Sequence, residues 1–243
     1  MSVLATAVAG LPEIARGADL AGLIAERVEL HADDIVVIAH KAVSKAEGAT
    51  VRMSSVTASP LAEELARSTG KDPRHVEVIL GQTAELVRAQ GIVLICRTIH
   101  GLVCANAGVD ASNTTDDDEL IMLPADPDAS ARALRTALPN HPAVLITDSF
   151  GRAWRVGQCD VAIGCAGLSP SEDWRGLSDS RGRELQATWI ATADQIASAA
   201  DLARRKDSRE PVVVVRGLGA HVTEDDGPGA AALIRPLEED LFG

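Results

Sequence analysis

The sequence predicts a mixed α/β fold, and two observations support this prediction. Short apolar runs, most of them rich in β-branched residues, alternate with helical patterns along the 243 residues. The chain is also long enough to bury a sizeable core, and no linker is long enough to divide it. We therefore expect a single domain over residues 1–243, with strands at 34–39, 91–95, 120–123, 143–147, 161–165 and 211–216.

Helix signals lie between these apolar runs. Ser59 and Pro60 form an N-cap and a first helical residue, and Gly70 provides a stop. The longest helix is expected over about 182–205, where Leu185, Trp189 and Ile196 share one side. Its many alanines suit a core helix or a subunit contact. The expected helices are 60–70, 73–89, 126–138 and 182–205.

Composition and charge exclude several function classes. The net charge of −12 repels a phosphate backbone, and aromatic residues make up only 2% of the chain, so nucleic-acid binding is not expected. The N-terminus lacks a basic segment before its apolar residues, and no apolar run approaches the ~20 residues of a membrane span. We expect a cytoplasmic protein without a membrane role. Bound metal ions can still let an acidic protein hold an anionic small molecule.

The four cysteines show no C-x-x-C spacing and lie in apolar, strand-like contexts. This pattern favours buried free thiols over a disulfide framework or a zinc site. The residues are Cys96, Cys104, Cys159 and Cys165.

The first candidate site is the stretch CANAGVDASN at 104–113. Asn106, Asp110 and Asn113 follow an apolar run at spacings of four and three residues. Carboxylate, amide and hydroxyl oxygens are the ligands that Mg²⁺ and similar ions prefer. The alternative is an Asx-turn between two strands. Neither nucleotide signature, the P-loop or the complete dinucleotide fingerprint, is present in the chain.

The second candidate site is the stretch ITDSFGRAWR at 146–155. An apolar strand ends in Asp148 and Ser149, and Arg152 and Arg155 follow. Ligands gather at the carboxyl ends of parallel strands, where a carboxylate and a hydroxyl can hold a metal ion and arginine can bind phosphate. Two aspartates at strand ends favour a paired-metal site for phosphoryl transfer. The alternative is a strand-to-turn cap with surface arginines.

The third candidate site follows the strand at 34–39. His40, Lys41 and Lys45 make a basic cluster in an acidic chain, and lysine can bind phosphate as a point charge. The alternative is a solvated turn with a structural histidine. The stretch GLPEI at 10–14 indicates by itself only a turn.

Together these stretches resemble a known family. The motifs GLPEI, DDIVVIAHKAVSKAEG, GLVCANAGVDASN, LPADPDASA, ITDSFGRAWRVGQCDVAIGCAGL, DWRG, GRELQAT and VVVVRGL occur in this order and span nearly the whole chain. The sequence resembles the coenzyme F420-0:γ-glutamyl ligases, which add glutamate to the deazaflavin cofactor F420. The resemblance covers the ligase domain, which many actinobacterial relatives fuse to a nitroreductase-like flavin domain. Because the chain ends at Gly243, we expect a stand-alone ligase or an isolated domain.

The resemblance implies GTP as co-substrate and two Mg²⁺ or Mn²⁺ ions per site, with K⁺ as a helper. The implied metal ligands are Asp110, Asp148 and Ser149, the last of which is often threonine in relatives. Arg152 would join Asp110 and Asp148 as a catalytic residue. The implied GTP contacts are Leu11, Pro12, Glu13, Ile14, His40, Lys41, Lys45 and Asn113.

The resemblance also implies a mechanism, in which the carboxylate of F420-0 attacks the γ-phosphorus of GTP. The resulting acyl phosphate would then react with the amine of L-glutamate. Two alternatives stay open: a ligase for another amino acid on a related cofactor, and a non-catalytic subunit that presents F420 precursors to a separate flavin protein.

The implied fold is a mixed sheet with flanking helices in an intertwined homodimer. Two departures from the family pattern stand out. The loop at 202–211 has no glycine and instead carries Arg204, Arg205 and Lys206, which could neutralise phosphate directly. Ile99 stands where a basic residue is expected, so a substrate contact by that residue is absent.

Overall fold

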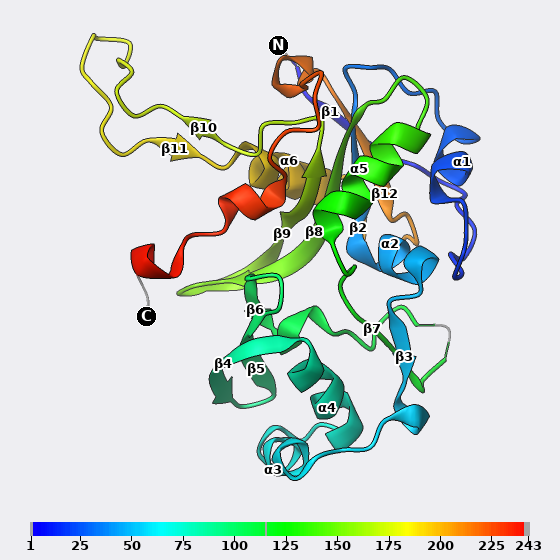
Figure 1. Ribbon diagram of the computed structural model, residues 1–243. Coiled ribbons are helices and arrows are strands. Elements are labelled where there is room, and N and C mark those ends of the chain that lie inside the picture. Colours follow the sequence, from blue (N-terminus) through cyan, green and yellow to red (C-terminus); the bar gives the residue numbers. More distant parts are fainter. Residues whose placement is uncertain (1, 115, 241–243) are drawn as a thin grey trace.

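The computed structural model describes residues 2–114 and 116–240 and confirms a mixed α/β fold (Figure 1). Its central sheet has the strand order β1-β12-β2-β8-β9. Strands β2 and β8 run parallel, whereas the other neighbouring pairs are antiparallel. The strands are β1 (Leu4–Ala7), β2 (Ile35–Ala39), β8 (Ala143–Arg152), β9 (Arg155–Ala166) and β12 (Val212–Arg216).

Both faces of this sheet are covered, which explains why its central strands are continuous apolar runs. Val36 and Ile38 point into one core cluster, and Ile35 and Val37 point into the other. Side chains of α1 (Leu20–Ala25), α2 (His40–Glu47) and α5 (Pro127–Ala137) fill the first cluster. Side chains of α6 (Thr192–Asp201) fill the second.

A smaller group of elements lies below the central sheet in Figure 1 and has a core cluster of its own. It contains a three-stranded sheet of order β4-β5-β6 that packs against two helices. The antiparallel pair β3 and β7 connects this group to the rest of the chain. The elements are β3 (Thr50–Arg52), α3 (Pro60–Thr69), α4 (Pro73–Gly81), β4 (Thr83–Gln90), β5 (Val93–Thr98), β6 (Val103–Ala105) and β7 (Glu119–Ile121).

Asp128 in the first turn of α5 ties three parts of the fold together. Its carboxylate accepts hydrogen bonds from the backbone N–H groups of Cys165 at 2.8 Å, Ala230 at 2.7 Å and Ala231 at 3.2 Å. Gly164 allows this close approach, since a Cβ there would lie 2.3 Å from the carbonyl oxygen of Pro127. The motifs LPADPDASA and VAIGCAG therefore serve the scaffold at these positions.

The helix predicted over 73–89 is wrong in its second half. Helix α4 ends at Gly81, and residues 83–90 form strand β4 instead. Gln90 pairs with Val93 across a tight turn in which Gly91 has a φ of 59°. Pairing with the β-prone strand β5 overrides the helical propensity of TAELVRAQ, because cross-strand contacts outweigh a weak local preference.

The helix predicted over 182–205 is also too long, since α6 covers only Thr192–Asp201. Residues 170–190 form an extended arm at the upper left of Figure 1, with β10 (Glu172–Asp173) paired antiparallel to β11 (Trp189–Ile190). Residues of the predicted helix pair across this arm instead, since the backbone N–H of Leu185 donates to the carbonyl oxygen of Leu177 and Trp189 pairs with Asp173. The alanine-rich part that is helical packs on the central sheet as a core helix.

The four cysteines are free, and three of them are buried. Burial raises the pKa of Cys104 and Cys165 to about 12, so both remain protonated thiols at neutral pH. Across residues 2–114 and 116–240, no helix combines the length and apolar character that crossing a bilayer requires.

Candidate active site

The parallel pairing of β2 with β8 brings two predicted site residues together. Ala39 pairs with Thr147, so the residues that follow, His40 and Asp148, lie at the same edge of the sheet. The Nε2 atom of His40 is 3.4 Å from Oδ1 of Asp148, and its Nδ1 atom is 3.3 Å from Oγ of Ser44. His40 is buried, so its imidazole holds Asp148 at a defined position.

Asp110 lies beside Lys41, the residue that follows His40 in α2. The Nζ atom of Lys41 is 2.5 Å from Oδ2 of Asp110 and donates to Oγ of Ser112 at 2.7 Å. Oδ1 of Asp110 accepts from the backbone N–H of Ser112 at 2.7 Å, which is the Asx-turn geometry that the sequence left open. Consecutive residues of α2 thus contact Asp148 and Asp110.

The environment of Asp110 favours its ionised form. Burial raises the pKa of this carboxyl group, but the hydrogen bonds from Lys41 and Ser112 outweigh burial. The pKa therefore lies below its ordinary value, and Asp110 is a carboxylate at neutral pH. An ionised carboxylate is the form that binds a hard cation.

An unusual turn precedes Asp110. Asn106, Ala107 and Gly108 all have left-handed backbone conformations, with φ values of 54°, 51° and 72°. This conformation is costly for alanine and tends to persist where the surrounding structure enforces it. Oδ1 of Asn106 accepts from the backbone N–H of Leu94 at 3.3 Å, so this side chain supports the turn.

Ser149 lies in a third group of polar residues, centred on Asp160 of β9. The carboxylate of Asp160 accepts from Oγ of Ser149 at 2.6 Å and from Oγ1 of Thr147 at 2.9 Å, and it forms an ion pair with Arg204. Burial raises the pKa of Asp160, but the hydroxyl of Ser149 and the guanidinium of Arg204 lower it by more than burial raises it. The pKa of Asp160 therefore lies below its ordinary value.

The loop at 202–211 reaches this third group. Lys206 Nζ donates to Oγ of Ser149 at 2.7 Å and to Oδ1 of Asp201 at 3.1 Å. Arg204 is largely buried and also donates to the carbonyl oxygen of Pro211 at 2.9 Å. In this structure, both basic side chains bind oxygen atoms of the protein.

The predicted nucleotide-binding residues near the N-terminus adjoin α2. Glu13 forms an ion pair with Lys45, which lies one helical turn after Lys41. Ile14 is buried and Leu11 is partly buried in the core cluster beside α2, whereas Pro12 is exposed.

Two predicted residues lack such contacts with the group. Asn113 is exposed, with a φ of 59°, in the turn that begins at Asp110. Arg152 lies further out on the β8–β9 hairpin, where its guanidinium donates to the carbonyl oxygen of Val156 at 2.7 Å. The structure does not bring Arg152 to the two aspartates, and its catalytic role stays a prediction.

Asp160 is a site residue that the sequence analysis missed. It stands inside an apolar strand, CDVAIGC, rather than after one. A charged residue within such a strand must be paired when it is buried, and this rule was the available signal. Arg204 supplies the pairing charge from 44 residues further along the chain.

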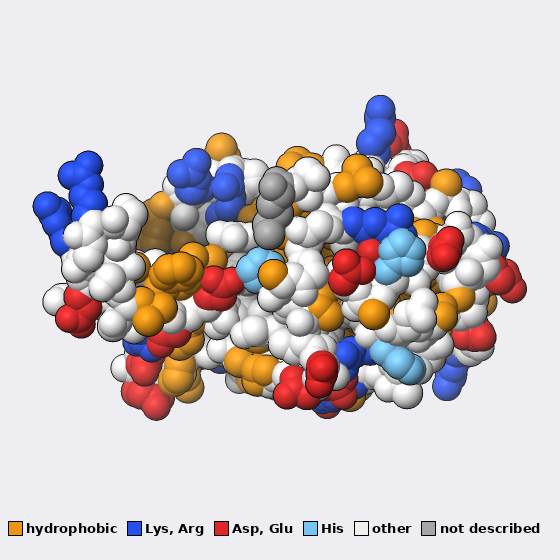
Figure 2. All heavy atoms as spheres, turned by 90° about the horizontal axis from the view of Figure 1, so that it is seen from above, with side chains coloured by type: hydrophobic (Ala, Val, Ile, Leu, Met, Phe, Trp, Pro, Cys, Tyr) orange, Lys and Arg blue, Asp and Glu red, His pale blue; other side chains and the backbone are white. Residues whose placement is uncertain are grey.

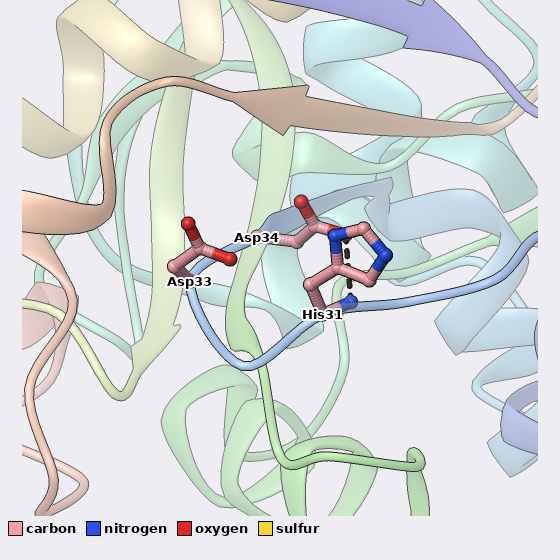
Figure 3. A group of neighbouring side chains, drawn as sticks. All are labelled: His31, Asp33 and Asp34. Carbon is pink, nitrogen blue, oxygen red and sulfur yellow. Dashed lines mark hydrogen bonds between the residues drawn. The ribbon is translucent and has the colours of Figure 1, made fainter.

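A second cluster of potential metal ligands lies at the opposite end of β2, where His31, Asp33 and Asp34 have ligand atoms within 4.8 Å of one another (Figure 3). Asp34 accepts from the backbone N–H of His31 at 2.9 Å and from Nε of Arg216 at 2.9 Å. These contacts neutralise its charge and join β2 to β12. We assign Asp34 a structural role.

Charge on the face seen in Figure 2 is mixed, with acidic and basic side chains interspersed. Apolar side chains gather toward the end of this view that carries the arm. Large apolar side chains are exposed on both the arm and the β8–β9 hairpin: Trp154, Val156, Trp174, Leu177 and Trp189.

Comparison with known proteins agrees with this arrangement. The family model for F420-0:Gamma-glutamyl ligase matches residues 10–217, a range that contains all the residues of the candidate site. The chain is 46% identical over 232 residues to the coenzyme F420:L-glutamate ligase of Methanopyrus kandleri, with 93% of this chain and 92% of the relative covered. The protein of the same name from Methanothermobacter thermautotrophicus is 42% identical over 252 residues, with 100% and 99% covered. The relative from Haloarcula marismortui is 41% identical, with 97% and 93% covered. The chain therefore belongs to the F420-0:gamma-glutamyl ligase family.

Proposed function

We propose that this protein joins L-glutamate to coenzyme F420-0 in F420 biosynthesis, with GTP as the energy source. Relatives named coenzyme F420:L-glutamate ligase match the chain over nearly its full length. The observation that carries the proposal is the pair of contacts made by α2: His40 contacts Asp148, and Lys41 contacts Asp110. This arrangement places two carboxylates and an ammonium group at the carboxyl ends of two parallel strands.

The nucleotide would bind around the start of α2. Lys41 and Lys45 lie on the same face of this helix, and its first N–H groups have no side-chain cap, so both can attract phosphate. Glu13 holds Lys45 beside the 11–14 stretch, and Asn113 lies near Ser112, which Lys41 contacts. The proposed GTP contacts are Leu11, Pro12, Glu13, Ile14, His40, Lys41, Lys45 and Asn113.

The donor set of this site fits a hard divalent cation. Asp110 and Asp148 offer carboxylate oxygens from side chains that are 41% and 18% exposed, so a hydrated ion can reach them. When bound, Mg²⁺ or Mn²⁺ would neutralise the charge of the phosphates. The site of K⁺ stays a prediction from the family resemblance.

The proposed reaction has two steps and needs no protein nucleophile. An oxygen of the F420-0 carboxylate bonds to the γ-phosphorus of GTP as the bond to the β-phosphate oxygen breaks, which releases GDP. The neutral amine of L-glutamate then attacks the acyl carbon, loses a proton, and phosphate leaves as the amide forms. Lys41 and Lys45 would stabilise the charge on the transferring group, and Arg152, further out on the β8–β9 hairpin, stays a predicted catalytic residue.

We also propose that two copies form a homodimer. The exposed tryptophans of the arm and the hairpin, Trp154, Trp174 and Trp189, are large apolar surfaces of the kind that subunit contacts bury. A separate nitroreductase-like flavin protein is a further candidate partner, in keeping with the fusion that the family resemblance implies.

Mass spectrometry of a reaction with F420-0, GTP, L-glutamate and Mn²⁺ or Mg²⁺ tests the ligase proposal. We expect a product heavier by one or more glutamyl units, and we expect none when GTP is omitted. The same reaction with other amino acids, or with ATP in place of GTP, would identify a related ligase that prefers another amino acid or another nucleotide. No product with any of them, while calorimetry still detects GTP binding, would contradict the ligase proposal and support a non-catalytic subunit.

A further inference from the structure

Lys206 occupies a place that is surrounded by protein oxygen atoms. Its Nζ atom lies 2.7 Å from Oγ of Ser149, 3.1 Å from Oδ1 of Asp201 and 3.7 Å from Oδ1 of Asp160. The side chain is 70% exposed, so these polar contacts rather than packing hold the ammonium in place. A hydroxyl and two carboxylates around one positive charge form a donor set that suits a metal ion equally well.

Four charged side chains around the hydroxyl of Ser149 balance one another. Asp160 and Asp201 supply two negative charges, and Arg204 and Lys206 supply two positive charges. The guanidinium of Arg204 pairs with Asp160 and has its Nε atom 3.8 Å from Oδ1 of Asp201. The negative charge that remains beside Ser149 is that of Asp148, whose Oδ1 accepts from the backbone N–H of Ser149 at 2.7 Å, and Asp148 belongs to the proposed ion site with Asp110.

The hydroxyl of Ser149 is engaged in both directions. Its proton is donated to Oδ1 of Asp160 at 2.6 Å, and its oxygen accepts from Lys206. The oxygen has a second lone pair, but a divalent ion bound there would lie next to the ammonium of Lys206, and like charges repel. By contrast, Asp110 and Asp148 face the single ammonium of Lys41 and the imidazole of His40.

We propose that Lys206 is a tethered cation that takes the place of a second divalent ion beside Ser149. The chain would then bind one divalent ion, at Asp110 and Asp148, instead of the two that the family resemblance implies. Lys206 acts as a positioning residue, since it fixes Ser149 next to Asp148 on β8. This inference rests on the proposed metal site, but its test does not depend on ligase activity.

The test counts Mn²⁺ ions bound per chain, by electron paramagnetic resonance of the free ion during a titration without nucleotide. We expect one ion for the wild type and two for Lys206→Met, which keeps the length of the side chain and removes its charge. Lys206→Arg keeps the charge and should bind one ion. Arg205→Met is the matched control, because Arg205 is on the same loop, is 83% exposed and pairs with Asp207.

An equal count for the wild type and Lys206→Met would overturn the tethered-cation proposal, as would two ions on the wild type or on Lys206→Arg. A count of none for the wild type and one for Lys206→Met would support the tethered cation and contradict the proposed ion at Asp110 and Asp148. Thermal melting of each variant checks that the fold is kept.

Discussion

Two buried aspartates, Asp128 of α5 and Asp160 within β9, show how one kind of side chain serves two different purposes. Asp128 accepts from the backbone N–H groups of Cys165, Ala230 and Ala231. Asp160 is bound instead by side chains, the hydroxyls of Thr147 and Ser149 and the guanidinium of Arg204. Backbone donors are fixed by the fold, whereas side-chain donors can move when a ligand arrives. For these two aspartates, the type of donor differs between the scaffold and the candidate site.

The largest effect on stability is expected at Asp128. Replacing it by alanine leaves three N–H groups without their acceptor, at about 1–3 kcal/mol for each buried group. We expect Asp128→Ala to lower the free energy of unfolding by roughly 3 kcal/mol or more, measured by urea denaturation.

Asp126→Ala is the matched control for this change. Asp126 lies two residues earlier and caps α5 through the backbone N–H of Ala129 at 2.9 Å. Loss of such a cap costs about 1 kcal/mol. If Asp128→Ala proved no more harmful than Asp126→Ala, Asp128 would not be a scaffold residue of the kind described.

A smaller loss is expected for Gly164→Ala, because the new Cβ would lie 2.3 Å from the carbonyl oxygen of Pro127. Overpacking of this kind costs about 1–3 kcal/mol. Gly151→Ala is the control, since a Cβ there meets nothing within 4 Å. Thermal melting of the two variants compares them, and equal melting temperatures would argue against the close packing of α5 on β9.

The stability that Asp160 provides should depend on pH. Its pKa is lowered in the folded state, so its contribution is present above the ordinary pKa of about 3.9 and is lost as pH falls through the lower, folded value. We expect the gap in unfolding free energy between wild type and Asp160→Asn to narrow below about pH 4. A gap of constant size from pH 7 to pH 3 would show that ionisation of Asp160 does not stabilise the fold.

Much of the candidate site could be predicted because its residues directly follow apolar strands. His40 and Asp148 come just after β2 and β8, and the parallel pairing of those strands brings them together. Asp160 and its partner Arg204 could not be located in this way, because their ion pair depends on how α6 and its following loop pack against β9. Local sequence carries no information on that packing.

The fold, like the site, could be predicted only in part from the local sequence. The β-branched runs identified the central strands, but the stretch at 83–90 became a strand through pairing with β5. The part of the predicted helix that lies in the arm at 170–190 instead pairs with the other limb of the arm, through Leu185 and β11. Composition alone favours a helix in both regions, and tertiary pairing decides otherwise.

The smallest effect is expected at Lys45, on the edge of the proposed nucleotide site. Lys45→Ala removes one charge-assisted contact to phosphate, so we expect the KM for GTP to rise by roughly tenfold with little change in kcat. Steady-state kinetics measures both constants. A lower kcat at an unchanged KM would assign Lys45 to the transition state instead.

The most direct test of the account is the ligation rate of Asp148→Asn, measured by mass spectrometry beside the thermal melting curve of the same variant. Asparagine keeps the shape of the side chain but removes the charge that would hold a divalent ion. We predict at least a ~100-fold loss of product formation with an unchanged melting temperature, and full activity for the surface control Asp207→Asn. A variant that keeps most of its activity with an intact fold would contradict the assignment of Asp148 to the metal site.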